Sequence, residues 1–554
     1  MQELKKLLAA ECQRQFDIDI EPQLEIPDRK FGDYATNLPL QVAAKTGKDP
    51  KAIAESLAKV LKKLPQISEV KVAGPGFINF FLSDKAILDS LEQGPLLHYK
   101  GQTVVVEYSD PNPFKVLHVG HLYTSVVGDA IAKILEAAGA KVARVNFGGD
   151  VGLHVAKTMW AVRQRLGGEY PEKLTKMAEK TGPDWLAEAY AEGNRAYEED
   201  TKAKEQIREL NERIYTLHDE KDEDSNLAKI YWLTRKWSYK CFETFYGMIG
   251  THFDRFYPES ETAGLGLKVV RENIGKVFEE SEGAIIFKGE VHNMHTRVFI
   301  NSQNLPTYET KDIGLALKKW QDYHYDRSII ITGNDIYEYM QVVLKALEQI
   351  EPELAKKTVH ITHGLVKATG GIKMSSRLGN IIRAEDVLSA ADKANTKANK
   401  QQNSDVALGA VKYAFLKQRI GADIIFNPDE SVSLQGNSGP YLQYAYVRAH
   451  SILKKSNNTT KPHPLAASLE NEERSLARKI SEYQEVVTKA TDELMPHHIC
   501  TYLYELAQTF NRFYETNRII DDPRQPIRLK LVGAYSKVLK NGLELLNIPV
   551  LERM

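Results

Sequence analysis

Glu107-Tyr-Ser-Asp-Pro-Asn-Pro-Phe-Lys-Val-Leu-His118-Val-Gly-His121-Leu-Tyr-Thr-Ser-Val-Val-Gly-Asp129 is the stretch of this chain that decides its fold. The apolar run from Val104 to Glu107 predicts a short buried strand, and the Asp-Pro-Asn-Pro segment predicts a turn. Helical periodicity begins at about Leu117 and continues through Leu135, and a second strand is predicted from Val142 to Asn146. Strand, helix and strand in this order open a doubly wound parallel sheet, whose ligands lie beyond the carboxyl ends of the strands.

The predicted helix carries two histidines in its first turn. A helix start presents unpaired backbone N–H groups and a positive dipole end, which suit a phosphate. His118 and His121 are three residues apart and share a helix face, and Gly120 leaves room for a flat base. The alternatives are a chance pattern in a surface helix or half of a metal site. A zinc site needs further ligands, and the three cysteines lack paired spacing: Cys12, Cys241 and Cys500.

A second motif lies far downstream, at Gly370-Gly-Ile-Lys373-Met374-Ser375-Ser376-Arg377-Leu-Gly-Asn380. Its glycines predict a mobile loop, and its lysine, hydroxyls and arginine offer donors and positive charge for a leaving pyrophosphate. Alone, such a basic loop is most often a solvated surface turn. Together with the two helix-start histidines it favours nucleotide chemistry.

The two motifs resemble the HIGH and KMSKS signatures of class I aminoacyl-tRNA synthetases, and the residues around them resemble arginyl-tRNA synthetases. The resemblance extends from Gly32-Asp-Tyr-Ala-Thr-Asn37 to Leu551-Glu-Arg-Met554. It implies an enzyme that activates L-arginine with ATP and Mg²⁺ and transfers the arginine to tRNA(Arg). It also implies a monomer without a membrane or DNA partner.

Composition agrees with this interpretation. A chain of 554 residues with 42% hydrophobic content is long enough for three or four domains. A net charge of −1 argues against a protein that coats nucleic acid through a strongly basic surface. No run approaches the roughly 18 apolar residues of a membrane helix, and the three cysteines fit a reducing compartment, so we expect a cytoplasmic protein.

Three domains are predicted. Residues 1–95 form an α+β module with a hairpin around Gly74-Pro-Gly76, and the resemblance makes it the additional domain that contacts the tRNA elbow. Residues 96–390 form the catalytic Rossmann-like sheet, with a charged helical insertion at about 160–255. Residues 391–554 form a helical bundle that resembles the DALR-type anticodon-binding domain.

Within these domains the patterns give more detailed expectations. The runs at 284–287, 297–300, 329–332 and 359–362 are predicted to continue the main sheet, with a turn from Tyr308 to Asp312. After about residue 390 no strands are predicted, and residues 470–490 are expected to form one helix.

The arginine site needs fixed carboxylates, because a planar guanidinium with five donors is best matched by paired acceptors. Glu107 and Asp312 are the candidates, and the resemblance adds Tyr308, Asn112 for the α-amino group, and Gln341. Asn112 between two prolines is alternatively a turn residue. Asp110 departs from the serine that the family often carries at this position. A site of this kind rejects lysine without editing, so no proofreading domain is expected.

The resemblance also assigns the remaining site residues. The predicted catalytic residues are His118, His121, Lys115 and Lys373. The predicted ATP-binding residues are His118, Gly120, His121, Gly364, Val366, Lys373, Met374, Ser375 and Ser376. The predicted tRNA-binding residues are Phe77, Asn79, Asn511, Arg512, Tyr514 and Met554, although aromatic residues such as Phe77, Phe510, Phe513 and Tyr514 are equally well explained as core.

Ser376 stands where the KMSKS pattern has its second lysine, so another group must meet the charge on pyrophosphate. Lys115 is the first candidate, and Arg377 is the alternative. Two other functions stay open at this point: a related RNA-binding protein that has lost catalysis, and another class I synthetase or nucleotidyltransferase. Intact histidines and Lys373 disfavour the first, and the Glu107 and Asp312 pair disfavours the second.

Overall fold

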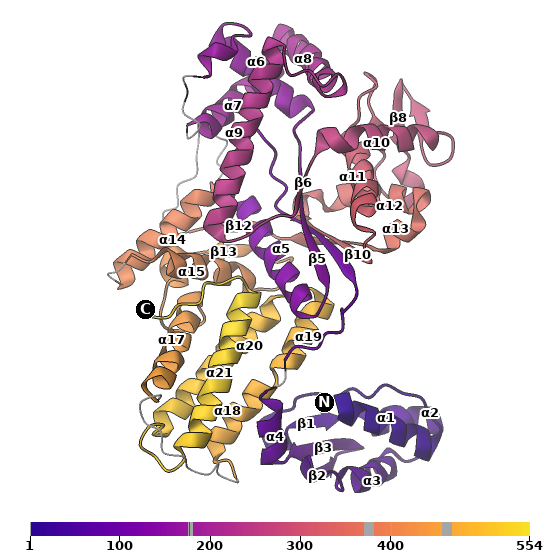
Figure 1. The fold of residues 1–554 in the computed structure, drawn as a ribbon. Helices are drawn as coiled ribbons and strands as arrows, with labels where there is room; N and C mark the ends of the chain where they lie inside the picture. Colours follow the sequence, from indigo (N-terminus) through magenta and orange to yellow (C-terminus); the bar gives the residue numbers. More distant parts are fainter. Residues whose placement is uncertain are drawn as a thin grey trace. The chain divides into compact units, whose positions relative to one another are not determined.

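The computed structural model describes residues 2–92, 94–175, 177, 181–369, 382–399, 402–456 and 468–554 (Figure 1). The chain forms two compact units, each assembled from three separate segments. The first unit contains Met1–Gly94, Arg448–Glu485 and Glu505–Leu539, and the second contains Pro95–Val447, Val486–Tyr504 and Lys540–Met554. None of the described helices combines the length and the apolar character needed to cross a bilayer.

The first 94 residues form an α+β module. Its antiparallel sheet has the order β1-β3-β2, with the strands β1 (Tyr34–Thr36), β2 (Ile67–Ala73) and β3 (Phe77–Leu82). The hairpin predicted around Gly74-Pro-Gly76 joins β2 to β3. The helices are α1 (Gln2–Phe16), α2 (Leu38–Thr46), α3 (Pro50–Leu61) and α4 (Asp84–Ser90). A core of their apolar side chains, including Leu57, Leu61 and Phe80, lies within this module.

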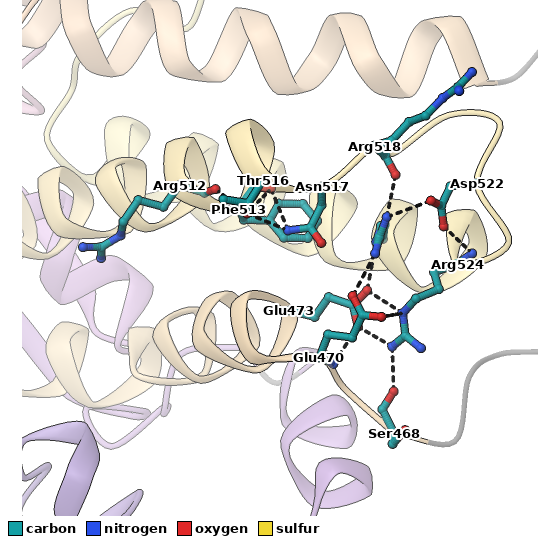
Figure 2. A network of polar contacts seen from close by, with 11 residues as sticks. Ser468, Glu470, Glu473, Arg512, Phe513, Thr516, Asn517, Arg518, Asp522 and Arg524 are labelled. Carbon is teal, nitrogen blue, oxygen red and sulfur yellow. Dashed lines mark hydrogen bonds and ion pairs between the residues drawn. The ribbon is translucent and has the colours of Figure 1, made fainter.

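Helices from the C-terminal part complete the first unit. The Arg474 guanidinium lies 2.7 Å from the carboxylate of Asp33 and also contacts Asp84. Glu473 beside it is fully buried, and Figure 2 shows its carboxylate among arginine side chains, with the Arg524 Nε donating at 2.8 Å. Burial raises the pKa of Glu473, but hydrogen bonds from Arg524 and Arg528 leave it below its usual value. The unit is therefore held in part by a charged network.

The second unit is built on a five-stranded parallel sheet with the order β11-β10-β4-β5-β6. Its strands are β4 (Thr103–Glu107), β5 (Lys141–Gly148), β6 (Arg255–Pro258), β10 (Arg327–Gly333) and β11 (Thr358–His363). From β4 the chain first adds strands on one side and later returns to add β10 on the other side. The strand order therefore reverses between β4 and β10, which is where doubly wound sheets bind their ligands. The predicted fold class is confirmed.

Helices cover both faces of this sheet. Figure 1 shows α5 (Val119–Ala137) on one face and α11 (Tyr308–Tyr323) with α12 (Tyr337–Ile350) on the other. The remaining helices here are α10 (Glu259–Glu272) and α13 (Pro352–Lys356). The predicted helical insertion has its own apolar core and consists of α6 (Leu153–Leu166), α7 (Gly182–Glu199), α8 (Thr201–Asp219) and α9 (Asn226–Ile249).

Two sequence predictions about strands were wrong. The strands β8 (Ala284–Phe287) and β9 (Arg297–Ile300) do not join the main sheet, but pair with β7 (Glu279–Ser281) in a separate antiparallel sheet. Glu282 and Gly283 link β7 to β8 with φ of 49° and 78°, the left-handed pair of a tight hairpin turn. Strands also do not cease after residue 390, since β13 (Ile424–Phe426) pairs in parallel with β12 (Val366–Ala368).

Two predictions about helices need correction as well. Tyr308 to Asp312 is not a turn but the first helical turn of α11. Residues 470–490 form two helices, α18 (Asn471–Ser481) and α19 (Tyr483–Glu493), in place of one. The other C-terminal helices are α14 (Ala384–Asn399), α15 (Ser404–Leu416), α16 (Pro428–Ser431), α17 (Gly439–Ser456), α20 (His497–Thr516) and α21 (Gln525–Leu545).

Candidate active site

A cavity of about 670 Å³ opens at the carboxyl ends of β4, β5, β10 and β11. We call it the strand-end cavity. Among its lining residues are nine of the predicted site residues: Glu107, Asn112, His118, Gly120, His121, Tyr308, Asp312, Gly364 and Val366. Lys115 and Gln341 are not among them, although Tyr339 and Met340 are. The predicted loop from Gly370 to Asn380, with Lys373, Met374, Ser375 and Ser376, lies outside the described residues.

The two histidines close the start of α5, which begins at Val119, two residues later than predicted. The His118 Nδ1 accepts the Gly120 N–H at 3.1 Å, and the His121 Nδ1 accepts the His118 N–H at 3.1 Å. A side chain on Gly120 would place its Cβ 2.8 Å from the His118 ring, so a larger residue would displace that ring. The local geometry therefore favours glycine between the two histidines.

These hydrogen bonds also decide which nitrogen carries the proton. Since both Nδ1 atoms accept, the proton of each neutral ring lies on Nε2, which makes both rings N–H donors. Burial, followed by the charge of Lys115, lowers the pKa of His118 to about 4. Burial also holds the pKa of His121 well below its usual value. Both rings are thus neutral near pH 7 and are suited to donating hydrogen bonds to phosphate oxygens.

Lys115 lies on the loop before these histidines. Its Nζ is 4.8 Å from the centre of the Tyr190 ring, and burial lowers its pKa. The neighbouring Phe114 is buried in the core of the helical insertion, and its N–H donates to the Ser238 hydroxyl of α9 at 2.9 Å. The insertion therefore fixes the loop that carries Lys115.

Carboxylates line the other end of the strand-end cavity. Tyr308, Asp312 and Lys319 follow one another on one face of α11, at a spacing of four and seven residues. Tyr339 donates its hydroxyl hydrogen to Asp312. Burial raises the pKa of Asp312 to about 8; the Tyr339 hydrogen bond opposes this shift and the charge of Glu107 adds to it.

Glu107 does not face the cavity as a free anion. It forms an ion pair with Lys319, and the two side chains are only 4% and 1% exposed. The Lys319 ammonium also donates to the Ser328 hydroxyl at 3.2 Å. A second buried pair joins Glu259, at the start of α10, to Lys311. Sequence reasoning missed both lysines.

His154, which sequence reasoning also missed, holds the Tyr308 side chain in place. The His154 Nε2 donates to the Gly149 carbonyl at 2.8 Å, so its Nδ1 accepts from the Tyr308 hydroxyl, 3.1 Å away. Asn112 lies next to this group, and its Oδ1 accepts the Gly149 N–H at 2.8 Å. Gly149 thus connects Asn112, the candidate contact of the α-amino group, through His154 to Tyr308, a candidate contact of the guanidinium.

The candidate tRNA residues fall into exposed and buried groups. In the first unit Phe77 is 39% exposed and Tyr514 is 41% exposed, whereas Asn79 is buried. Figure 2 shows Arg512 pointing away from the Glu473 network. Phe510 and Phe513 are core residues, and Phe510 stacks on Tyr535 with ring centres 3.9 Å apart. In the second unit Met554 is 37% exposed.

Comparisons with known proteins agree along the whole chain. Residues 2–82 match the arginyl-tRNA synthetase N-terminal domain, residues 85–428 match the class I (R) tRNA synthetase catalytic domain, and residues 442–554 match the DALR anticodon-binding domain. The arginine–tRNA ligase of Clostridium perfringens is 30% identical over 99% of this chain and 100% of its own length. That of Borreliella burgdorferi is 30% identical over 89% of this chain and 88% of its own.

A solved structure gives the same result. The arginyl-tRNA synthetase of Thermus thermophilus is 26% identical and superposes with a TM-score of 0.81, covering 100% of both chains. The catalytic-domain match, over residues 85–428, and the superposition, over the whole chain, include the strand-end cavity and the helix start beside it. This chain therefore belongs to the arginyl-tRNA synthetase family.

Proposed function

We propose that this chain is an arginine–tRNA ligase, which converts L-arginine and ATP to arginyl-adenylate and pyrophosphate and then transfers the arginine to the 3′ end of tRNA(Arg), releasing AMP. The observation that carries the proposal is that one cavity holds buried carboxylates at one end and a helix start with two neutral histidines at the other. Carboxylates suit a guanidinium, and a helix start suits phosphates.

Arginine would occupy the carboxylate end. We assign Glu107, Asp312 and Tyr308 to its side chain, Asn112 to its α-amino group, and Gln341 as a further contact. The buried ion pairs and the Tyr339 and His154 hydrogen bonds hold these groups in place. A substrate without matching donors would leave these polar groups unpaired, which supports the rejection of lysine without an editing step.

ATP would lie across the start of α5, between the histidines and Gly364 and Val366. In the first step an oxygen of the arginine carboxylate bonds to the α-phosphorus, and the bond from that phosphorus to pyrophosphate breaks. No proton has to move, so His118 and His121 need act only as neutral N–H donors to the phosphoryl oxygens. ATP brings Mg²⁺, and Lys115 and Lys373 supply further positive charge.

The remaining parts would bind tRNA(Arg). We assign residues 1–95, through Phe77 and Asn79, to the tRNA elbow. We assign residues 391–554, through Asn511, Arg512, Tyr514 and Met554, to the anticodon side, with residues 96–390 as the catalytic domain around the insertion at 160–255. Exposed aromatic and guanidinium groups at Tyr514 and Arg512 suit unstacked bases. We propose that the enzyme acts in the cytoplasm and that it acts as a monomer.

Aminoacylation of total tRNA with each amino acid in turn tests the proposal. We expect arginine alone to be attached, and arginine-dependent exchange of pyrophosphate into ATP in the presence of tRNA. An inactive chain that binds tRNA would instead be the related protein without catalysis. Charging with another amino acid would make it a different class I synthetase.

A further inference from the structure

More carboxylates line the strand-end cavity than the two, Glu107 and Asp312, that are expected to bind arginine. Four buried or half-buried carboxylates line it near α11: Glu107, Asp110, Glu259 and Asp312. Lys319 neutralises Glu107, and Lys311 neutralises Glu259. Within the described part of the chain, no lysine, arginine or histidine forms an ion pair with Asp110 or Asp312. These two carboxylates are fully available to a cationic substrate, whereas Glu107 offers only the oxygen that does not contact Lys319.

The backbone holds Asp110 in an unusual conformation. Ser109 and Asp110 have φ of 75° and 47°, two successive left-handed residues between β4 and the turn. Non-glycine residues rarely adopt this region because it is strained for them, so the surrounding contacts must enforce it. The Ser109 hydroxyl lies 2.9 Å from the Tyr246 hydroxyl of α9, and the Asp110 Oδ1 accepts the Phe147 N–H of β5 at 2.8 Å.

This placement brings Asp110 to the deep end of the cavity. Asp110 accepts the N–H of Phe147, within β5, whereas Asn112 accepts the N–H of Gly149, one residue beyond the end of that strand. Asp110 also lies close enough to Glu107, Lys319 and Asp312 for their charges to act on it. Asn112 is therefore nearer the helix start, and Asp110 is nearer the carboxylate end.

We propose that Asp110 determines specificity for arginine: its carboxylate joins those of Asp312 and Glu107 in accepting the guanidinium N–H groups, although one oxygen of Glu107 is already paired with Lys319. Five N–H donors in a fixed plane need several acceptors, and Oδ1 of Asp110 already has one donor, so the carboxylate keeps capacity for more. This inference rests on the arginine site of the proposed function.

The electrostatics of the empty cavity support the pairing. Burial, followed by the charge of Glu107, raises the pKa of Asp110 well above its usual value. Burial likewise raises the pKa of Asp312. Without a cation these neighbouring carboxyl groups retain protons, and a bound guanidinium would favour their ionised forms. Arginine binding should then release protons to the solvent, whereas a neutral ligand of the same shape should not.

The experiment compares Asp110→Asn with Asp254→Asn. Asn keeps an acceptor for the Phe147 N–H and removes only the charge. Asp254 is the matched control, because its Oδ2 accepts the Arg144 N–H of the same strand at 2.8 Å but it does not line the cavity. Binding of arginine and of citrulline, its neutral isostere, is measured by calorimetry or by inhibition of pyrophosphate exchange. Proton release is measured in two buffers of different ionisation enthalpy.

We expect Asp110→Asn to weaken arginine binding about 10- to 100-fold, the usual effect of a hydrogen bond to a charged group. Citrulline binding should change little, proton release should fall, and Asp254→Asn should behave as the wild type. Equal losses for arginine and citrulline, or unchanged arginine binding and proton release, would overturn the role of Asp110. A wild-type chain that binds no arginine would instead refute the proposed function itself.

Discussion

Arginine binding should weaken steeply as the pH falls below 8, because the empty strand-end cavity keeps Asp312 protonated. Burial raises the pKa of this carboxyl group to about 8, and the charges of Glu107, Glu259 and Glu309 act in the same direction. Only the ionised form accepts two parallel N–H hydrogen bonds from one edge of a guanidinium. A pKa above the working pH therefore reduces the apparent affinity by the ionised fraction.

The size of the effect follows from the pKa. One pH unit corresponds to about 1.4 kcal/mol, so at pH 7 ionising Asp312 costs about 1.4 kcal/mol and at pH 6 about 2.7 kcal/mol. Ionisation of Asp312 alone should thus raise the apparent Kd for arginine about 10-fold from pH 7 to pH 6, and the raised pKa of Asp110 adds to this rise. Burial lowers the pKa of His118 to about 4 and that of His154 to about 3, so neither ring gains a proton in this range.

Direct binding of labelled arginine from pH 6 to pH 9, without ATP or tRNA, measures this dependence. Asp312→Asn should bind more weakly and lose the part of the slope that Asp312 contributes, whereas the part contributed by Asp110 should remain. Citrulline is the control ligand, and its binding should be far less sensitive to pH. A flat arginine Kd across the range, or an unchanged slope in Asp312→Asn, would refute the reasoning.

Three further predictions concern the same cavity. Replacing either helix-start histidine with alanine should slow pyrophosphate exchange ~10²-fold or more while leaving arginine binding near normal, and an equal loss of arginine affinity would contradict their role as phosphate donors. Lys115→Ala should slow exchange by a similar ~10²-fold, and adding Ser376→Lys should restore part of it; a Lys115→Ala enzyme with normal exchange would transfer the role to another cation. Lys319→Met should lower stability by about 3–5 kcal/mol by leaving Glu107 buried without a partner, and adding Glu107→Gln should recover part of the thermal midpoint. A double variant as unstable as the single one would show that the lysine matters through packing alone.

The sequence predicts the elements of the site better than their partners. The strand, loop and helix around His118 follow from local periodicity, and the structure places them within two residues. The sequence predicts a turn where α11 begins, although Thr307 before the helix and Glu309 in its first turn are helix-start signals. Its extended N-cap makes no side-chain hydrogen bond, which weakens that signal.

The lysines that neutralise the cavity could not be predicted in this way. Lys319 and Glu107 are 212 positions apart, and only the return of the chain to β10, beside β4, brings them together. Local patterns contain no information on such a contact. The same holds for Glu259 and Lys311, whose charges cancel within the fold although each resembles an ordinary surface residue in the sequence.

The three-segment composition of the first unit affects how the chain is made. Asp33 leaves the ribosome 441 residues before Arg474, and at ~5–20 residues per second this separation lasts about 20–90 s. The apolar core of the N-terminal module lies within its own first 82 residues, so that core can form at once. The Asp33 carboxylate remains without its partner during this time, and water can hydrate it until Arg474 has been synthesised. Because the contacts of Arg474 with Asp33 and Asp84 are ionic, their late formation exposes no apolar surface at these two residues on the growing chain.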